Sequence, residues 1–159
     1  MPWTEVHDQS FTALKEALCQ ATDQPLRIVD LNLPFSISVD ASDYAVAGYL
    51  SQSDATGVDH PLAFFSCKLS ESQRAWATVH KEAYAVLVGL RKFRNWIFGS
   101  EMIHVYSDHN PLTFLTESAP KNAKLMRWSL ALQEFNLSFH YIKGRLNVAP
   151  DCLSRMGPD

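Results

Sequence analysis

Long hydrophobic runs, paired cysteines and a strong excess of one charge are all missing from this 159-residue sequence. No stretch approaches the roughly 18 consecutive apolar residues of a membrane span, and the N-terminus is polar and acidic, so we expect neither a membrane segment nor a secretory signal. The three cysteines are an odd number without metal-ligand spacing, which predicts reduced thiols in an intracellular protein. Charged residues make up only 19%, too few for a disordered or coiled-coil chain.

What the sequence does contain fits one globular domain with a sizeable core, since 47% of its residues are apolar. The net charge of −3 argues against a simple nucleic-acid binder, but the charge is unevenly distributed. Residues 1–90 hold five basic and eleven acidic side chains, whereas residues 91–145 hold eight and four. This split is typical of a protein that binds metal ions with one half and phosphates with the other, and also of many proteins with neither function.

Apolar periodicity divides the chain into an N-terminal arm, residues 1–33, and a main domain, residues 34–159. The arm carries a helical stripe, and the domain opens with strands that alternate apolar and polar residues. The order predicts an α/β fold with a mixed sheet and helices on its faces. The expected elements of the domain are strands 35–40, 46–50 and 61–67, helix 72–96, strand 102–106, helices 110–115 and 123–135, strand 137–141 and helix 150–155.

Four acidic residues stand at unusual places in this pattern. Asp40 and Asp108 end two predicted strands, Glu82 lies inside the long helix, and Asp151 follows Pro150 at the start of the last helix. Taken singly, each has an ordinary explanation, because strand ends and helix starts often carry Asp and a mid-helix Glu is usually solvated. Together they predict a convergent acidic cluster that repels itself unless cations fill it. Oxygen ligands of this kind suit Mg²⁺ or Mn²⁺ and not zinc.

Eight sequence blocks in order carry a resemblance to a known family. They are VDASDY (39–44), LSQ (50–52), HPLAFFS (60–66), KEAYA (81–85), FR (93–94), SDHNPL (107–112), RW (127–128) and GRLNVAPDCLSR (144–155). With these blocks the sequence resembles the ribonuclease H domain of reverse transcriptases from Ty3/gypsy-type LTR retrotransposons. The arm is similar to the family's connection from the polymerase half.

The resemblance implies a ribonuclease H-like fold, a five-stranded mixed sheet with helices on both faces. It also implies that Asp40, Glu82, Asp108 and Asp151 are catalytic and bind two Mg²⁺ or Mn²⁺ ions. The implied reaction is hydrolysis of the RNA strand of an RNA–DNA hybrid, leaving 3′-hydroxyl and 5′-phosphate ends. The implied partners are the hybrid and the polymerase domain of the same polyprotein, in a cytoplasmic virus-like particle or in the nucleus. The basic residues expected to contact the hybrid are Arg127, Lys143 and Arg145.

Some residues depart from the family pattern, and some interpretations stay open. Ala45 and Ala47 stand where the family usually has glycine, so their methyl groups either weaken RNA binding or only stiffen a strand. Pro150 replaces a usual alanine beside the last carboxylate. His109 either shapes the turn after Asp108 or transfers protons. A non-catalytic module that packs against a polymerase is the alternative function, and an integrase or transposase core is a third.

Overall fold

Five strands form one mixed sheet in a computed structural model that describes residues 4–22, 29–109 and 123–155. Their order across the sheet is β3-β2-β1-β4-β5. The strands β1, β2 and β3 pair as an antiparallel meander, while β1–β4 and β4–β5 are parallel. The strands are β1 (Phe35–Ala41), β2 (Ala45–Ser53), β3 (Asp59–Lys68), β4 (Ile103–Ser107) and β5 (Leu137–Tyr141). This topology confirms the predicted five-stranded mixed sheet.

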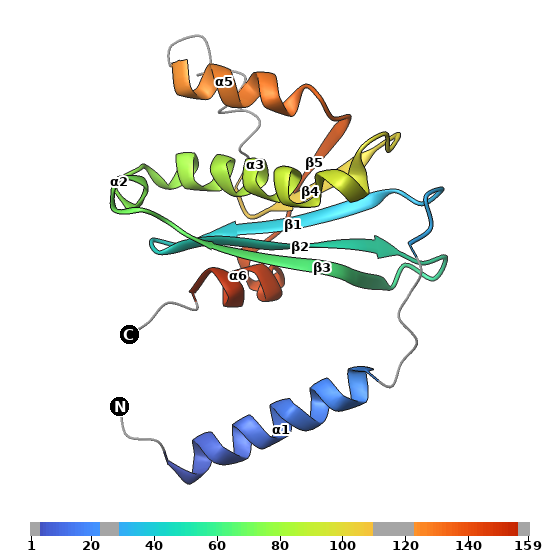
Figure 1. Cartoon of the computed structure of the whole chain (residues 1–159), viewed down its shortest axis with the longest axis vertical. Helices are drawn as coiled ribbons and strands as arrows, with labels where there is room; N and C mark the ends of the chain where they lie inside the picture. The colour runs from blue at the N-terminus through green and yellow to red at the C-terminus, as the bar shows by residue number, and fades with distance from the viewer. Residues whose placement is uncertain (1–3, 23–28, 110–122, 156–159) are drawn as a thin grey trace.

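Helices cover both faces of the sheet, as expected. The long helix α3 (Thr78–Ile97) and α5 (Ala123–Leu132) lie on one side, and α6 (Val148–Arg155) lies on the other (Figure 1). The main apolar core fills the space between the sheet and α3, because β1 turns Ile37 and Val39 toward that helix. Helix α6 packs against β1 and β2 on the opposite face. Asp40 therefore lies on the face that α6 covers.

The predicted helix over residues 72–96 is wrong in one respect, since it is broken near its start. A capping box on Ser70 begins the short helix α2 (Glu71–Arg74), and Ala77 is extended before α3 begins at Thr78. Between them Trp76 packs its ring against Tyr84 of α3 and Trp128 of α5. The tertiary packing of this partly buried ring outweighs the local preference for a continuous helix.

Other boundaries agree with the sequence to within a few residues. The arm contains α1 (Glu5–Thr22), and a short 3₁₀ helix, η2 (Gly144–Leu146), precedes α6. Helix α6 begins two residues before Pro150, which still lies in its first turn. The helix predicted over residues 110–115 lies outside the described residues. Among those residues, no helix has the length and apolarity of a membrane span.

Candidate metal centre

Two of the four predicted carboxylates meet at one edge of the sheet. In the parallel pair β1–β4, Ser38 lies opposite Tyr106, so Asp40 and Asp108 follow two residues later at the same ends of neighbouring strands. Asp40 is buried, with 5% of its surface exposed, and Asp108 is half-buried. Burial, followed by the negative charge of Asp108, raises the pKa of Asp40 above its ordinary value. The strand register thus places both carboxylates where the sequence predicted.

Glu82 faces this pair from α3 and, among the acidic residues that the structure describes, is the most deeply buried, with 1% exposed. Burial, followed by the charges of Asp40 and Asp108, raises the pKa of Glu82 to about 8. Among the residues that the structure describes, its Oε2 atom has no hydrogen-bond partner. A buried acceptor without a donor is unfavourable, so this oxygen is a candidate ligand for a cation.

His109 lies in the same cluster, although it was not among the metal ligands predicted from the sequence. Its Nδ1 atom lies 2.8 Å from Asp108 Oδ1 and 3.7 Å from Glu82 Oε1. Ligand atoms of Glu82, Asp108 and His109 all lie within 4.8 Å of one another. The SDHNPL block (107–112) could have indicated this, because His109 directly follows Asp108 and therefore lies beside its carboxylate.

The fourth carboxylate, Asp151, approaches from α6 on the other face of the sheet. Its charge is among the causes that raise the pKa of Asp40, after burial and the charge of Asp108. Asp151 Oδ1 accepts a 2.6 Å hydrogen bond from Arg155 Nε, one turn along the helix. Three residues after Asp151, the Ser154 hydroxyl donates to Asp40 Oδ2 and opposes the rise in its pKa. Helix α6 is thus anchored to the carboxylate of β1.

The donor set fits a hard divalent cation. Asp40 and Glu82 both have raised pKa values because they are buried and lie near other carboxylates, so ionising the whole cluster requires compensating positive charge. The unpartnered Oε2 of Glu82 offers a ligand atom to such an ion. Carboxylate oxygens suit Mg²⁺ and Mn²⁺, and the imidazole of His109 suits Mn²⁺ better than Mg²⁺.

The predicted nucleic-acid contacts divide into two groups. Lys143 and Arg145 are exposed and flank Gly144, where an added Cβ would lie 3.0 Å from Asp108 Oδ2. The backbone between the two basic side chains therefore touches the carboxylate cluster. Arg127 is exposed on α5, and its Nε donates to the Ala123 carbonyl of the same helix. Lys143 and Arg145 therefore lie beside the carboxylate cluster, whereas Arg127 contacts the backbone of its own helix.

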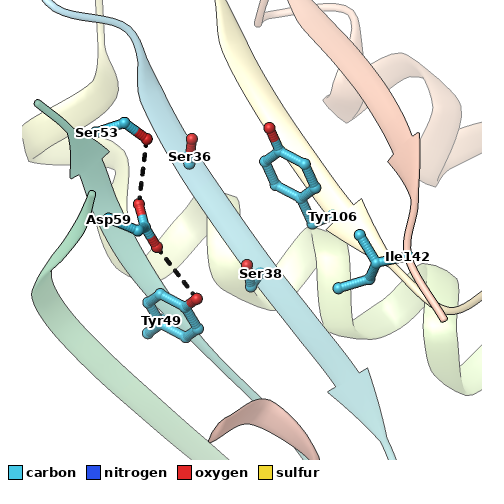
Figure 2. Close-up of a pocket in the computed structure, with 7 residues that line it drawn as sticks. All are labelled: Ser36, Ser38, Tyr49, Ser53, Asp59, Tyr106 and Ile142. Carbon is cyan, nitrogen blue, oxygen red and sulfur yellow. Dashed lines mark hydrogen bonds between the residues drawn. The ribbon is translucent and has the colours of Figure 1, made fainter. Parts of the chain in front are cut away.

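A polar pocket that was not predicted from the sequence lies on the sheet face that carries Asp40 (Figure 2). Tyr49 donates to Asp59 Oδ2 at 3.2 Å, and Ser53 donates to Asp59 Oδ1 at 3.5 Å. Because Ser38 and Asp40 share a face of β1, the pocket continues the polar surface away from the carboxylates. Its lining comes from several strands, so only the strand register reveals it: Ser36, Ser38, Tyr49, Ser53, Asp59, Tyr106 and Ile142.

The two alanines that depart from the family pattern are buried on β2, with Ala47 completely inaccessible. They alternate with Val46, which belongs to the core on the α3 side, so they lie on the face that α6 covers. Their methyl groups pack inside the protein, which favours the interpretation that they stiffen the strand. The neighbouring Gly48, in contrast, has no room for a methyl group, because an added Cβ would lie 2.3 Å from the Ser38 carbonyl oxygen.

Sequence comparisons show that this chain is similar to parts of retroelement polyproteins. Residues 30–135 match the model of the RNase H-like domain found in reverse transcriptase. The chain is 39% identical over 150 residues to the retrovirus-related Pol polyprotein from transposon opus of Drosophila melanogaster, covering 94% of this chain and 15% of that protein. It is 32% identical over 157 residues to the transposon Tf2-3 polyprotein of Schizosaccharomyces pombe, covering 97% of this chain and 12% of that protein. The chain thus spans a small part of these relatives.

Solved structures share the fold. The native protease-reverse transcriptase of prototype foamy virus superposes with a TM-score of 0.63 at 22% identity, covering 90% of this chain and 19% of that one. LC11-RNase H1, solved in complex with an RNA/DNA hybrid, gives a TM-score of 0.54 at 16% identity, covering 75% and 92%. With the matched residues 30–135 and the sheet topology, these likenesses confirm the resemblance predicted from the sequence blocks. The chain belongs to the family of RNase H-like domains found in reverse transcriptases.

Proposed function

We propose that this domain is a metal-dependent endoribonuclease that hydrolyses the RNA strand of RNA–DNA hybrids, leaving 3′-hydroxyl and 5′-phosphate ends. The observation that supports the proposal is the group of ligand atoms from Glu82, Asp108 and His109 within 4.8 Å of one another, beside Asp40, whose pKa is raised by burial and by the charges of Asp108 and Asp151. Within the described part of the chain, one buried oxygen of Glu82 has no hydrogen-bond partner. Two proteins of this fold, the foamy viral protease-reverse transcriptase and LC11-RNase H1, have been solved with an RNA/DNA hybrid. Their bound substrate class is the one we propose here.

In this proposal the four carboxylates hold two Mg²⁺ or Mn²⁺ ions. When bound there, the ions supply the charge that activates a water molecule for attack and stabilises the leaving 3′-oxygen. Asp40 and Asp108 project from the ends of paired strands, so the hydrogen-bonded sheet fixes the positions of their ligand oxygens. Glu82 and Asp151 supply oxygens from the two opposite layers of helices.

The remaining residues of the site orient the cluster and the substrate. His109 contacts Asp108, and this contact keeps the Asp108 carboxylate oriented toward Glu82. Lys143 and Arg145, beside the Gly144 contact to Asp108, would bind phosphates of the hybrid at the cluster. Little sequence preference is expected, because a hybrid is recognised mainly by its shape, phosphates and 2′-hydroxyls. The partner in the full protein would be the polymerase domain of a Pol polyprotein.

The proposal is tested by cleavage of a hybrid labelled on its RNA strand, with wild type and Asp108→Asn compared in Mg²⁺. Asn keeps the shape of the side chain but removes a charge that the cations require. Cleavage should fall by at least ~100-fold, the scale of losing one preorganised electrostatic contribution to the transition state. Glu134→Gln, an exposed carboxylate paired at 3.9 Å with Arg94, is the matched control and should cleave normally.

Each other outcome has a definite meaning. Equal rates for wild type and Asp108→Asn would identify the nuclease as a contaminant. No cleavage by a folded wild-type chain in Mg²⁺ or Mn²⁺ would contradict the proposal and favour a non-catalytic module that packs against a polymerase.

A further inference from the structure

The turn between β1 and β2 is bonded to both helical layers that bring carboxylates to Asp40. Its Ser42 is buried, and the Ser42 hydroxyl accepts hydrogen bonds from the backbone N–H groups of Tyr44 and Ala45, both at 3.1 Å. The same hydroxyl donates to the carbonyl oxygen of Ser154 on α6. The turn is therefore closed on itself and attached to the helix that carries Asp151.

The next residue attaches the turn to the other layer. Asp43 Oδ1 lies 2.7 Å from Nζ of Lys81, the residue that precedes Glu82 in α3. The Lys81 side chain is only 5% exposed, whereas the Asp43 side chain is 84% exposed. An ammonium group removed from water needs an anionic partner, and Asp43 reaches back from the solvent side to provide it. Lys81 also holds the pKa of the Asp43 carboxyl below its usual range.

Because α3 and α6 lie on opposite faces of the sheet, the turn is well placed to set their positions relative to Asp40 (Figure 1). We propose that the Lys81–Asp43 ion pair is a positioning device that sets the separation of Glu82 from Asp40 and thereby the affinity of the cluster for divalent cations. Lys81 is then a positioning residue and not a catalytic one. The inference deepens the proposed function and depends on its metal site.

A phosphate-binding role for Lys81 is the competing explanation. The structure disfavours it, because a lysine that binds a phosphate must present its ammonium group to solvent. The ammonium of Lys81 is buried and already occupied by Asp43. Lys143 and Arg145, which are exposed beside Asp108, are better placed for phosphates.

The sign of one mutational effect separates positioning from simple electrostatics. Lys81→Met removes a positive charge beside the cluster, so Coulomb attraction alone predicts tighter binding of a cation. Positioning predicts weaker binding, because Glu82 loses its fixed distance from Asp40. Asp43→Asn weakens binding in both cases, so Lys81→Met is the decisive variant.

The experiment measures Mn²⁺ binding to the full chain by calorimetry without nucleic acid, with melting temperatures confirming that each variant is folded. Lys81→Met and Asp43→Asn should each weaken Mn²⁺ binding about 5- to 20-fold, and the double variant should be no weaker than the worse single one. Asp43→Glu, which keeps the carboxylate, should restore binding to within about two-fold of wild type. Glu134→Gln serves as the neutral control.

Tighter or unchanged Mn²⁺ binding by Lys81→Met would overturn the inference, as would additive effects of the two substitutions. A Lys81→Met chain with normal Mn²⁺ binding and weakened, less salt-dependent hybrid binding would establish the phosphate role instead. If Lys81→Met does not fold, the double variant decides the outcome, because it removes one charge of each sign: Coulomb attraction alone then predicts nearly unchanged Mn²⁺ binding, whereas positioning predicts the same 5- to 20-fold loss. Because no substrate is present, a chain that binds Mn²⁺ as predicted but cleaves no hybrid would contradict only the proposed function.

Discussion

The two faces of the central sheet are built by the same strands and have opposite chemistry. On the face toward α3, Ile37 and Val39 of β1 are completely buried in an apolar core. On the other face, Ser38 and Asp40 of the same strand adjoin a polar pocket and the carboxylate cluster. The comparison shows that one strand supplies stability and chemistry from alternate residues, because successive side chains point to opposite faces.

The two faces also have opposite effects on the stability of the domain. Clustered, partly buried carboxylates lower stability when no cation neutralises them, since burial and neighbouring charges raise the pKa values of Asp40 and Glu82. The apolar face has to offset this effect, because the net stability of a domain is only about 5–15 kcal/mol. Function on one face therefore depends on packing on the other.

The largest effect is expected from breaking the apolar face. Ile37→Ala leaves a cavity beneath α3 and should lower the free energy of unfolding by about 2–5 kcal/mol. Ser36→Ala, one residue earlier and on the polar face, should cost about 1 kcal/mol or less. Urea titrations of both variants measure this difference, and similar decreases in the two variants would contradict the assignment of the two faces.

Removing the charge of Glu82 should stabilise the metal-free chain above neutral pH. The folded-state pKa of about 8 exceeds the ordinary value of 4.5, so the folded chain binds more protons than the unfolded one between these values. Its stability should therefore fall as pH rises from 4.5 to 8. Glu82→Gln should flatten this slope and raise the melting temperature at pH 8 by several degrees, given roughly 2–4 °C per kcal/mol at this size.

Addition of Mn²⁺ should make wild type melt at a higher temperature than Glu82→Gln, the reverse of their order without metal. The cation stabilises wild type by binding its folded state, while Glu82→Gln has lost a ligand and gains less. A wild-type melting temperature that rises with pH in chelator, or that ignores millimolar Mn²⁺, would contradict the electrostatic description of the cluster.

A smaller effect is expected from the basic residues beside the cluster. Lys143→Ala combined with Arg145→Ala should weaken hybrid binding and flatten its salt dependence, by about 0.9 in log–log slope for each duplex phosphate that the protein no longer neutralises. Mn²⁺ binding should stay unchanged, because neither side chain is a ligand. Arg127→Ala provides the comparison, and an equal decrease in salt slope there would move the predicted substrate path toward α5.

The smallest effect concerns a carboxylate with the opposite environment. In the β2–β3 turn, Asp54 accepts hydrogen bonds from the hydroxyl of Thr56, His60 and the backbone N–H groups of Thr56 and Val58, which hold its pKa well below the usual range. Its contribution to stability is present above pH ~4 and is lost as pH falls further. Asp54→Asn should lower the melting temperature slightly at pH 7 and by a smaller amount at pH 2. A larger decrease in melting temperature at pH 2 than at pH 7 would contradict this pH dependence.

Local periodicity was enough to predict most of the fold. The alternation in Leu137–Tyr141 predicted β5 to the residue, and the strand beginning at Phe35 predicted β1, because a period of two is visible without tertiary information. The break between α2 and α3 was missed because it depends on Trp76 packing against Trp128, more than fifty residues later. No local pattern records such a contact.

The candidate site was predictable where it depends on strand ends. Asp40 and Asp108 close two strands, and a parallel pairing brings such ends together. The sequence could not reveal that Ser154 bonds Asp40, or that the pocket joins Ser38 to Tyr106, because both depend on how α6 docks and on the strand register. The roles of the four carboxylates stay predictions.

Anomalous scattering from crystals of the full chain soaked in millimolar MnCl₂ tests the central claim most directly, since it locates bound manganese without relying on activity. Two manganese peaks are expected, both within coordination distance of carboxylate oxygens from Asp40, Glu82, Asp108 and Asp151. Asp40→Asn crystals soaked in parallel should lose at least one peak. An absence of manganese at these carboxylates in wild-type crystals, or peaks that Asp40→Asn leaves unchanged, would contradict it.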